Sequence, residues 1–396
     1  MTRRPTLPAT TPPPAEVFAV DTRGAQIVWR PRAGRHVELV LDGQVVAEGP
    51  ADAVTAVDVA GLAPGRGHRL DLHVDGRPSS TLEVPPLPRL SGEPRVRVAT
   101  ISDLHLGEEG FGLVREMSER RPPGGRRHPL RCALAAVEEA RAWGADILVV
   151  KGDITHEGRP DEWDQFDEVL DAAAGIPVVA VPGNHDTVGK RHSVDAAAAL
   201  QSRGLFPDPV QVVDLAGVRV VAVDTTVPGH GYGTIAHHLD ELVAAVDVDV
   251  PVLVFTHHHL QTTPVPWFWP LGIDRRDGLG VLDSLVAVNP DLVVSCGHTH
   301  RNRARRHGTA LVTEVGATKD HPGVWAGYEV HPDGLRQSVR RVARPDCLAW
   351  TERTRRAVGG IWGRWSPGTL ADRCVTHRRL RLPARVAEVS AVPVAS

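Results

Sequence analysis

The sequence predicts an α/β protein preceded by a small all-β sandwich domain, and three observations support this fold class. Short alternating segments fill the first quarter of the chain, a proline-rich stretch follows, and apolar strands then alternate with amphipathic helices. With 396 residues the chain is long enough for two or three domains. Apolar residues make up 42% of the chain, which is sufficient for a sizeable core.

The N-terminal region divides into a tail and a β module. Residues 1–14 hold five prolines and no periodic pattern, so we expect a flexible tail there. Residues 15–88 contain the alternating segments AQIVWR, HVELVLDG, TAVDVAGL and HRLDLHVDG, separated by turn residues, which predicts a β-sandwich. The stretch VDVAGLAPGRGHRLDLHVDG resembles a fibronectin type III module, although His68 stands where that family usually has a tyrosine. We expect a spacer or packing module without chemistry of its own.

A proline-rich linker over residues 89–94 precedes the main domain, which we assign to residues 95–343. Six apolar segments there predict buried strands: RVRVATIS, ADILVVKG, IPVVAVPG, VRVVAVDT, VPVLVFTH and DLVVSCGH. Helical spacing marks the segments LRCALAAVEEARAWG, EWDQFDEVLDAAAG and LGVLDSLVAVN. Residues 344–396 predict a largely helical extension that docks on the main domain through its tryptophans.

Charge and cysteine content limit the partners and the compartment. The chain has 45 basic and 48 acidic residues, so no overall field favours nucleic acid, and only local arginine patches leave that partner open. The four cysteines form no CxxC pair, and the first residues lack an apolar secretion segment, which favours a reduced, cytoplasmic setting. No apolar run approaches the roughly 18 residues of a membrane span, so we expect no membrane partner.

Residues with metal-binding side chains follow five of the predicted strands, at the edge where open α/β sheets place their ligands. The five elements are SDLHLG, KGDITHEG, PGNHDT, FTHHH and CGHTH. In an extended segment residues i and i+2 point to the same side, so Asp103 with His105, and His298 with His300, each aim two groups into one pocket. Carboxylates, an amide oxygen and imidazoles without thiolates suit borderline and hard metal ions.

In this order the five elements resemble the pattern DxH, GD, GNH(D/E), H and GHxH of the calcineurin-like metallophosphoesterases. The resemblance implies a four-layer αββα fold, two metal ions and hydrolysis of phosphoric esters, and we expect a phosphodiesterase. A nuclease or a phosphomonoesterase of the same superfamily is the alternative enzyme. A metal-free scaffold is the non-enzyme alternative, but scaffolds of this superfamily have lost ligand histidines, and here every ligand position is filled.

Carried over position by position, the resemblance assigns seven metal ligands. They are Asp103, His105 and His300 for one ion, Asn184, His257 and His298 for the other, and Asp153 as the bridge. His258 stays open as the alternative to His257, because the proline that the family usually shows soon after this histidine pair is delayed in HHHLQTTP. We expect a divalent or mixed-valence pair from Mn, Fe, Zn, Ni and Co, with a bridging hydroxide as nucleophile because metal-bound water ionises near pH 7.

The resemblance also implies two catalytic residues. His185 would face the phosphoryl group, where it stabilises charge or protonates the leaving oxygen, and Asp186 would fix the tautomer of His185. His156 stands where purple acid phosphatases carry a tyrosine ligand, so the site resembles instead the bacterial cyclic-nucleotide and diester phosphodiesterases. Two readings of His156 stay open, a metal contact or a solvated loop position.

Two basic stretches and one aromatic stretch flank the motifs. The segments REMSERRPPGGRRHPLR, residues 115–131, and RNRARRH, which includes Arg301 and Arg303, either face an anionic substrate or are solvated. The segment TTPVPWFWPLG forms either a pocket wall or core packing. The partner we expect is a small phosphoester substrate, with cyclic nucleotides among the candidates.

Overall fold

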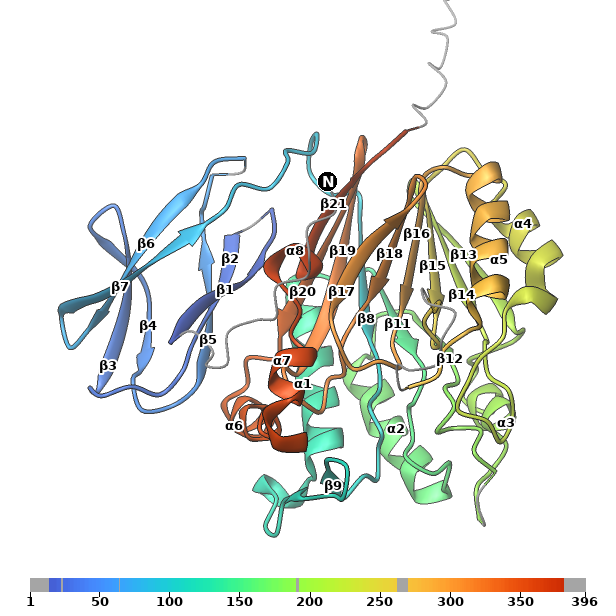
Figure 1. The fold of residues 1–396 in the computed structure, drawn as a ribbon, viewed down its shortest axis with the longest axis horizontal. Coiled ribbons are helices and arrows are strands. Elements are labelled where there is room, and N and C mark those ends of the chain that lie inside the picture. The colour runs from blue at the N-terminus through green and yellow to red at the C-terminus, as the bar shows by residue number, and fades with distance from the viewer. Residues whose placement is uncertain (1–13, 23, 64, 190–191, 262–269, 381–396) are drawn as a thin grey trace, which may run out of the picture.

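The computed structural model describes residues 14–22, 24–63, 65–189, 192–261 and 270–380. An all-β unit lies at one end of the molecule, and sheets flanked by helices make up the rest (Figure 1). The predicted fold class is therefore confirmed. The expected tail, apart from Pro14, and residues 262–269 of the aromatic stretch lie outside the described residues. Within the described ranges, no helix is long and apolar enough to cross a membrane.

The all-β unit consists of two antiparallel sheets. One holds β1 (Ala15–Val20), β2 (Gly24–Trp29) and β5 (Thr55–Ala60); the other holds β4 (Gln44–Pro50), β3 (His36–Leu41), β6 (His68–Val74) and β7 (Arg77–Val84). Inward-facing apolar residues such as Trp29 and Leu70 fill the space between them. His68 Nε2 lies 3.1 Å from the Ala63 carbonyl oxygen, a return contact that a corner tyrosine makes in related sandwiches. The resemblance to fibronectin type III stays a prediction.

Two six-stranded sheets form the main domain. Sheet I has the order β12 (Val178–Val181), β11 (Ile147–Lys151), β8 (Val96–Ile101), β19 (Val324–His331), β20 (Gly334–Arg341) and β21 (Cys374–Arg378). Sheet II has the order β13 (Val210–Leu215), β14 (Val218–Val223), β15 (Val252–Thr256), β16 (Leu292–Cys296), β18 (Ala310–Glu314) and β17 (Arg303–His307). Strands β8, β11 and β12 of sheet I run parallel to one another, as do β14, β15, β16 and β18 of sheet II.

The sheets and helices stack in four layers, as Figure 1 shows. The helices α1 (His128–Trp143) and α2 (Pro160–Ala172) cover sheet I, and α4 (Leu239–Val246) and α5 (Arg275–Val288) cover sheet II. Alternate strand residues such as Val149 and Phe255 fill the core between the sheets. Because neighbouring residues of a buried strand face opposite layers, continuous apolar runs such as ILVV suit this position. The predicted αββα architecture is confirmed.

Shorter elements connect these layers. They are β9 (Gly110–Phe111), β10 (Met117–Ser118), α3 (Ala196–Gln201), and the 3₁₀ turns η1 (Pro123–Gly125), η2 (Ala236–His238) and η3 (Val358–Gly360). The C-terminal extension contains α6 (Pro345–Thr354), α7 (Trp362–Trp365) and α8 (Leu370–Arg373) before β21. The extension is thus helical for most of its described length, but it ends as the edge strand of sheet I, which the sequence pattern did not predict.

The all-β unit is not a loosely tethered spacer. Phe18 and Val28 belong to the same apolar cluster as Val339 and Leu335 of β20. The Gln26 side chain donates to the Arg341 carbonyl at 2.9 Å and accepts from the Arg341 backbone N–H at 2.7 Å. The division at residues 89–94 stays a prediction about domains, but the packing joins the two units through one core.

Glu139 on α1 lies at this junction, and its buried carboxyl should make the free energy of unfolding depend on pH. Its carboxylate accepts hydrogen bonds from Trp325 Nε1 at 3.0 Å and the Ala343 backbone N–H at 2.6 Å. Burial raises the pKa of Glu139 to about 7. The folded protein therefore favours the protonated carboxyl. This preference contributes fully to the free energy of unfolding below the unfolded pKa of about 4.3, and the contribution is lost as the pH rises through the pKa of the folded protein.

We expect Glu139→Gln to be more stable than wild type at pH 8 by about 1–2 kcal/mol and similar at pH 5, because the amide carries no charge to desolvate. Thermal unfolding at both pH values measures the difference. Glu138→Gln, at a neighbouring side chain that is 63% exposed, is the control. A stability difference that does not change with pH would contradict the expectation.

Candidate metal centre

The predicted site residues converge from both sheets onto one cluster. Asp103, Asp153 and Asn184 follow β8, β11 and β12 of sheet I, whereas His257 and His298 follow β15 and β16 of sheet II. Because the sheets pack face to face, the loops at the carboxyl ends of these strands meet across the sandwich. The candidate metal centre thus needs both halves of the fold.

The backbone at this cluster is unusual. Five non-glycine residues adopt positive φ values between +47° and +67°: Asp103, His105, Asp153, His298 and His300. Such conformations are uncommon for L-residues and cost on the order of 1 kcal/mol or more each, and they concentrate at functional sites. The extended geometry expected for the DxH and HxH pairs is therefore wrong, since the chain turns sharply there. The side chains of both pairs still reach one cluster.

Two glycines make room for this arrangement. A Cβ atom on Gly183 would lie 2.3 Å from Asp153 Oδ1, and one on Gly152, whose φ is +80°, would lie 2.6 Å from His257 Nδ1. Both contacts are too short for any side chain. The glycines of the GD and GNH elements therefore allow the close approach that brings the bridging candidate and its neighbours together.

Asp153 lies at the middle of the cluster. Its Oδ2 is 3.4 Å from His105 Nε2, and its Oδ1 is 3.3 Å from His257 Nε2. The backbone N–H of His185 donates to Oδ1 at 2.8 Å. The carboxylate is buried. Its two oxygens thus face two different groups of ligands, as a bridging carboxylate requires.

Each group places its ligand atoms close together. On one side, His300 Nε2 lies 3.3 Å from His105 Nε2 and 3.4 Å from Asp103 Oδ1. On the other side, His257 Nε2 lies 3.1 Å from Asn184 Oδ1 and 3.2 Å from His298 Nδ1. The structure therefore brings together all seven residues that the sequence predicts as ligands.

The outward nitrogens of three imidazoles are held by the protein. His257 Nδ1 lies 2.9 Å from the Lys151 carbonyl oxygen, and His298 Nε2 lies 2.9 Å from that of Leu271. His300 Nδ1 lies 2.7 Å from Asp320 Oδ2. Each outward nitrogen faces an oxygen that can accept its N–H, so the other nitrogen, which faces the cluster, is the one available as a metal ligand. Metal-ligating histidines are oriented in this way.

The buried carboxylates of the cluster stabilise positive charge next to them. Burial alone would lower the pKa of His300, but the Asp320 and Asp103 carboxylates outweigh it and raise that pKa to about 10. Burial likewise opposes a proton on His257, yet Asp153 raises its pKa to about 9. With only the protein's own groups present, the carboxylates thus draw protons onto two histidines. Metal cations fit this donor set, because they satisfy the carboxylates and leave the imidazoles neutral.

The open choice between His257 and His258 has a geometric answer. His258 Nδ1 lies 2.9 Å from Thr225 Oγ1, and its Nε2 is buried without a hydrogen-bond partner among the described residues. His258 can also be grouped with His257 and His298 as a possible ligand set. The contacts with Asn184 and Asp153, however, belong to His257. The geometry favours the first histidine of the triplet.

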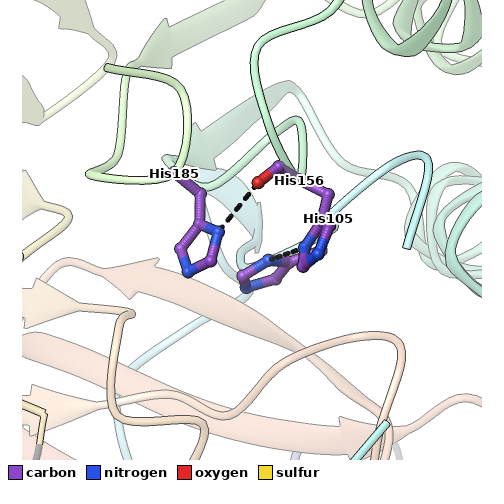
Figure 2. Close-up of side chains that lie close together, drawn as sticks. All are labelled: His105, His156 and His185. Atoms are coloured by element: carbon purple, nitrogen blue, oxygen red, sulfur yellow. Dashed lines mark hydrogen bonds between the residues drawn. The ribbon is translucent and has the colours of Figure 1, made fainter. Parts of the chain in front are cut away.

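His156 and His185 lie together beside His105, as Figure 2 shows. The rings of His156 and His185 stack at 5.4 Å with an interplanar angle of 22°. His156 Nδ1 is 3.5 Å from His105 Nδ1, the nitrogen of His105 that faces away from Asp153. Burial lowers the pKa of His156 to about 4. His156 is thus half-buried and packed against two site histidines, so of its two open readings the solvated loop position does not hold.

Asp186 has a different role from the one expected. Its carboxylate accepts hydrogen bonds from the backbone N–H groups of Gly183, Ile154 and Thr155 and from the Thr155 hydroxyl, at 2.6–3.1 Å. His185 Nδ1 instead donates to the His156 carbonyl oxygen at 2.9 Å. A backbone carbonyl therefore sets the tautomer of His185. Asp186 ties the GD loop to the GNH loop, because four donors converge on it.

The basic stretches contribute little to the cluster. Arg301 Nε donates to Glu314 at 2.6 Å and its guanidinium lies over the Trp365 ring, and Arg131 pairs with Glu119 at 2.7 Å. Arg115 Nη2 lies 3.4 Å from His156 Nε2, beside the predicted site residues. Arg301 is paired with Glu314 and its side chain is 11% exposed, so the solvated alternative does not hold for it, and contact with a substrate stays a prediction.

Asp320 is a site residue that the sequence analysis missed. Besides holding His300, it accepts a hydrogen bond from Trp362 Nε1 at 2.9 Å, which links the C-terminal extension to the cluster. Its signal in the sequence is weak, since Asp320 lies six residues beyond the strand ALVTE, whereas the predicted ligands lie one to four residues beyond theirs. That strand runs parallel to β16 in sheet II.

We expect Asp320→Asn to weaken metal binding about 10- to 100-fold, the usual cost of losing a partner that orients a ligand. Competition with a chromophoric chelator measures the affinity. Asp283→Asn is a matched control, because Asp283 pairs with His307 in the same way on the surface. Equal affinity in wild type and Asp320→Asn would show that Asp320 does not orient His300 for a metal.

Residues 96–302, just over half of the chain, match the family model of the calcineurin-like phosphoesterases. The chain belongs to this family. Over 193 residues it is 31% identical to the glycerophosphodiester phosphodiesterase GpdQ of Enterobacter lignolyticus, a match that covers 44% of this chain and 62% of that protein.

Two relatives are named 3′,5′-cyclic adenosine monophosphate phosphodiesterase CpdA. That of Pseudomonas aeruginosa is 31% identical over 167 residues, covering 41% of this chain and 57% of the relative. That of Escherichia coli K12 is 26% identical over 275 residues, covering 64% and 92%. The chain therefore spans less than two thirds of the length of the Enterobacter and Pseudomonas proteins.

Proposed function

We propose that this protein is a metal-dependent phosphodiesterase with a dinuclear centre. The observation that carries the proposal is the position of Asp153, whose two buried carboxylate oxygens face separate groups of ligands at 3.3 Å and 3.4 Å. A cavity of about 370 Å³ opens directly on this cluster and is lined by His105, Asn184 and His185. A phosphoryl group that enters the cavity meets the cluster and His185 together.

The ligand assignment follows the geometry. One ion would be held by Asp103, His105 and His300, the other by Asn184, His257 and His298, with Asp153 between them. Divalent ions held by these residues would supply Lewis acidity and would lower the pKa of a bound water to near 7. The nitrogen and oxygen donors without thiolate suit Mn, Fe, Zn, Ni or Co.

His185 is the residue we assign to the leaving group. The His156 carbonyl accepts from its Nδ1, so Nε2 is the atom left to hold or move a proton. The backbone N–H of His185 is fixed on Asp153 and its ring is stacked on His156. A histidine held this firmly can donate to the departing oxygen without losing further conformational freedom.

The substrate class we infer is a small phosphodiester, because the relatives are named for glycerophosphodiesters and for cyclic adenosine monophosphate. We also infer a cytoplasmic location. All four cysteines are free and buried, as is usual in a reducing compartment.

The test is to strip the protein with a chelator, return Mn, Fe, Zn, Ni and Co separately, and assay glycerophosphocholine, cyclic adenosine monophosphate and p-nitrophenyl phosphate. We expect no turnover without metal, restored turnover with at least one ion, and a preference for diesters over the monoester. Full activity in protein shown by elemental analysis to be metal-free would contradict the mechanism. A preference for the monoester would contradict the substrate class.

A further inference from the structure

The cavity above the metal centre has an apolar side that the proposed chemistry does not use. We propose that this side binds an alkyl or acyl chain, so that the substrate is an amphiphilic phosphodiester. The proposal rests on the proposed phosphodiesterase function and names its substrate class. In the reaction, water adds across one P–O bond and releases an alcohol and a phosphate monoester.

The cavity lining combines two kinds of residue. The site histidines, Asp153 and Asn184 supply polar groups. Apolar side chains line much of the rest, namely Phe111, Leu113, Leu271, Val358, Trp362 and Trp365, and the Trp362 ring lies 6.0 Å from the ring of His300. The loop that follows the DxH element supplies the first two, and the C-terminal extension supplies the last three. A phosphodiester bound at the metal centre would therefore direct one of its ester groups against an apolar surface.

Several large apolar side chains in the cavity lining or next to it in sequence are exposed to solvent. Leu113 is 78% exposed and its neighbour Val114 is 80% exposed, the two highest values among the large apolar side chains of the described residues. Leu271 in the wall and Ile361 beside Trp362 are also exposed. Grouped apolar side chains at the mouth of a pocket indicate a ligand that covers them.

Val358 in the cavity wall has a strained backbone conformation. Its φ is +52°, a conformation that is strained for a β-branched residue. The Glu116 carboxylate accepts its backbone N–H at 3.0 Å and so joins the extension to the loop that carries Leu113. Strain that the surrounding contacts maintain is typical of ligand-binding segments.

Among the described residues, the apolar side chains of the cavity wall carry two polar atoms, the indole nitrogens of Trp362 and Trp365, and so offer few groups that could recognise a nucleobase by hydrogen bonds. The Trp362 N–H is bound to Asp320, and Lys319 and Glu108 are bound to each other at 2.5 Å. Among the described residues of the cavity, Thr299 supplies the hydroxyl, and it follows His298 of the metal centre. Recognition of a polar group requires matched donors and acceptors, whereas hydrocarbon and indole surfaces suit a chain.

The experiment compares diesters that differ only in chain length. Acetyl, butanoyl and hexanoyl glycerophosphocholine, all kept as monomers, are assayed with the metal-loaded full chain. We expect kcat/KM to rise about two- to fourfold per added methylene. Leu113→Ser and Leu271→Ser should each flatten this rise. Val45→Ser, at an exposed apolar residue of β4 in the all-β unit, should keep it.

Binding of short alkylphosphocholines, measured by calorimetry, separates this proposal from the proposed function because it needs no hydrolysis. Affinity that rises with chain length and falls in Leu113→Ser supports the chain site, even if no diester is hydrolysed. Rates and affinities that do not depend on chain length would overturn the proposal. Faster hydrolysis of cyclic adenosine monophosphate than of every acyl diester, unchanged in Leu113→Ser, would also overturn it.

Discussion

Asp153→Asn is expected to lower phosphodiester hydrolysis by at least about 10³-fold, because each bound ion supplies several kcal/mol of transition-state stabilisation. The amide is nearly the same size as the carboxylate, but it has no charge and only one oxygen acceptor. Since the two oxygens of Asp153 face separate ligand groups, metal content should fall at both positions. Asn184→Ala, which removes a ligand from one group, should lower it at one. Elemental analysis of the two purified variants measures their metal content per chain.

Asp161→Asn, at an exposed carboxylate on α2, is the control for the loss of a charge. Circular dichroism establishes that the variants are folded. If Asp153→Asn kept two ions per chain and lost activity, the residue would act in the chemistry and not as a bridge. If it kept both ions and full activity, the proposed centre would be wrong.

His185→Ala should lose about 10²–10⁴-fold in kcat/KM with an alkyl leaving group, the usual contribution of an acid catalyst. The loss should be much smaller with a p-nitrophenyl ester, because that phenolate departs without protonation. Metal content should stay near wild type, since the Nδ1 of His185 is held by the His156 carbonyl and its ring lies beside the ligand groups. A series of diesters with leaving groups of graded pKa measures the effect.

His237→Ala, at an exposed histidine in η2, is the control. Equal losses across the series would assign His185 to charge stabilisation. A loss of metal would make it a ligand, which would be consistent with its place in the group with His105 and His156.

The fold and the site could be predicted where the signal is local. Each ligand candidate directly follows an apolar strand, so the sequence alone shows both the strand and the residue at its end. The strand β20, with the sequence GLRQSVRR, carries no such signal. Its Arg340 is buried between Asp21 and Asp58 of the all-β unit. A pattern that depends on a distant partner is not visible in one segment.

The hydrogen-bond partners of the site histidines could not be predicted from the sequence either. The Lys151 and His156 carbonyls are backbone groups, which any residue would supply. The choice between His257 and His258 depends on Thr225, which binds the second histidine from the loop that follows the neighbouring strand β14. The expected role of Asp186 failed because adjacency in sequence does not place two side chains in contact.

The most direct test of a dinuclear centre bridged by Asp153 is anomalous X-ray diffraction from crystals of the Mn-loaded protein. The account predicts two anomalous peaks about 3.5–4 Å apart, one on each side of the Asp153 carboxylate. One peak would lie among Asp103, His105 and His300, and the other among Asn184, His257 and His298. A single peak, or peaks away from Asp153, in crystals of protein that hydrolyses phosphodiesters would contradict it.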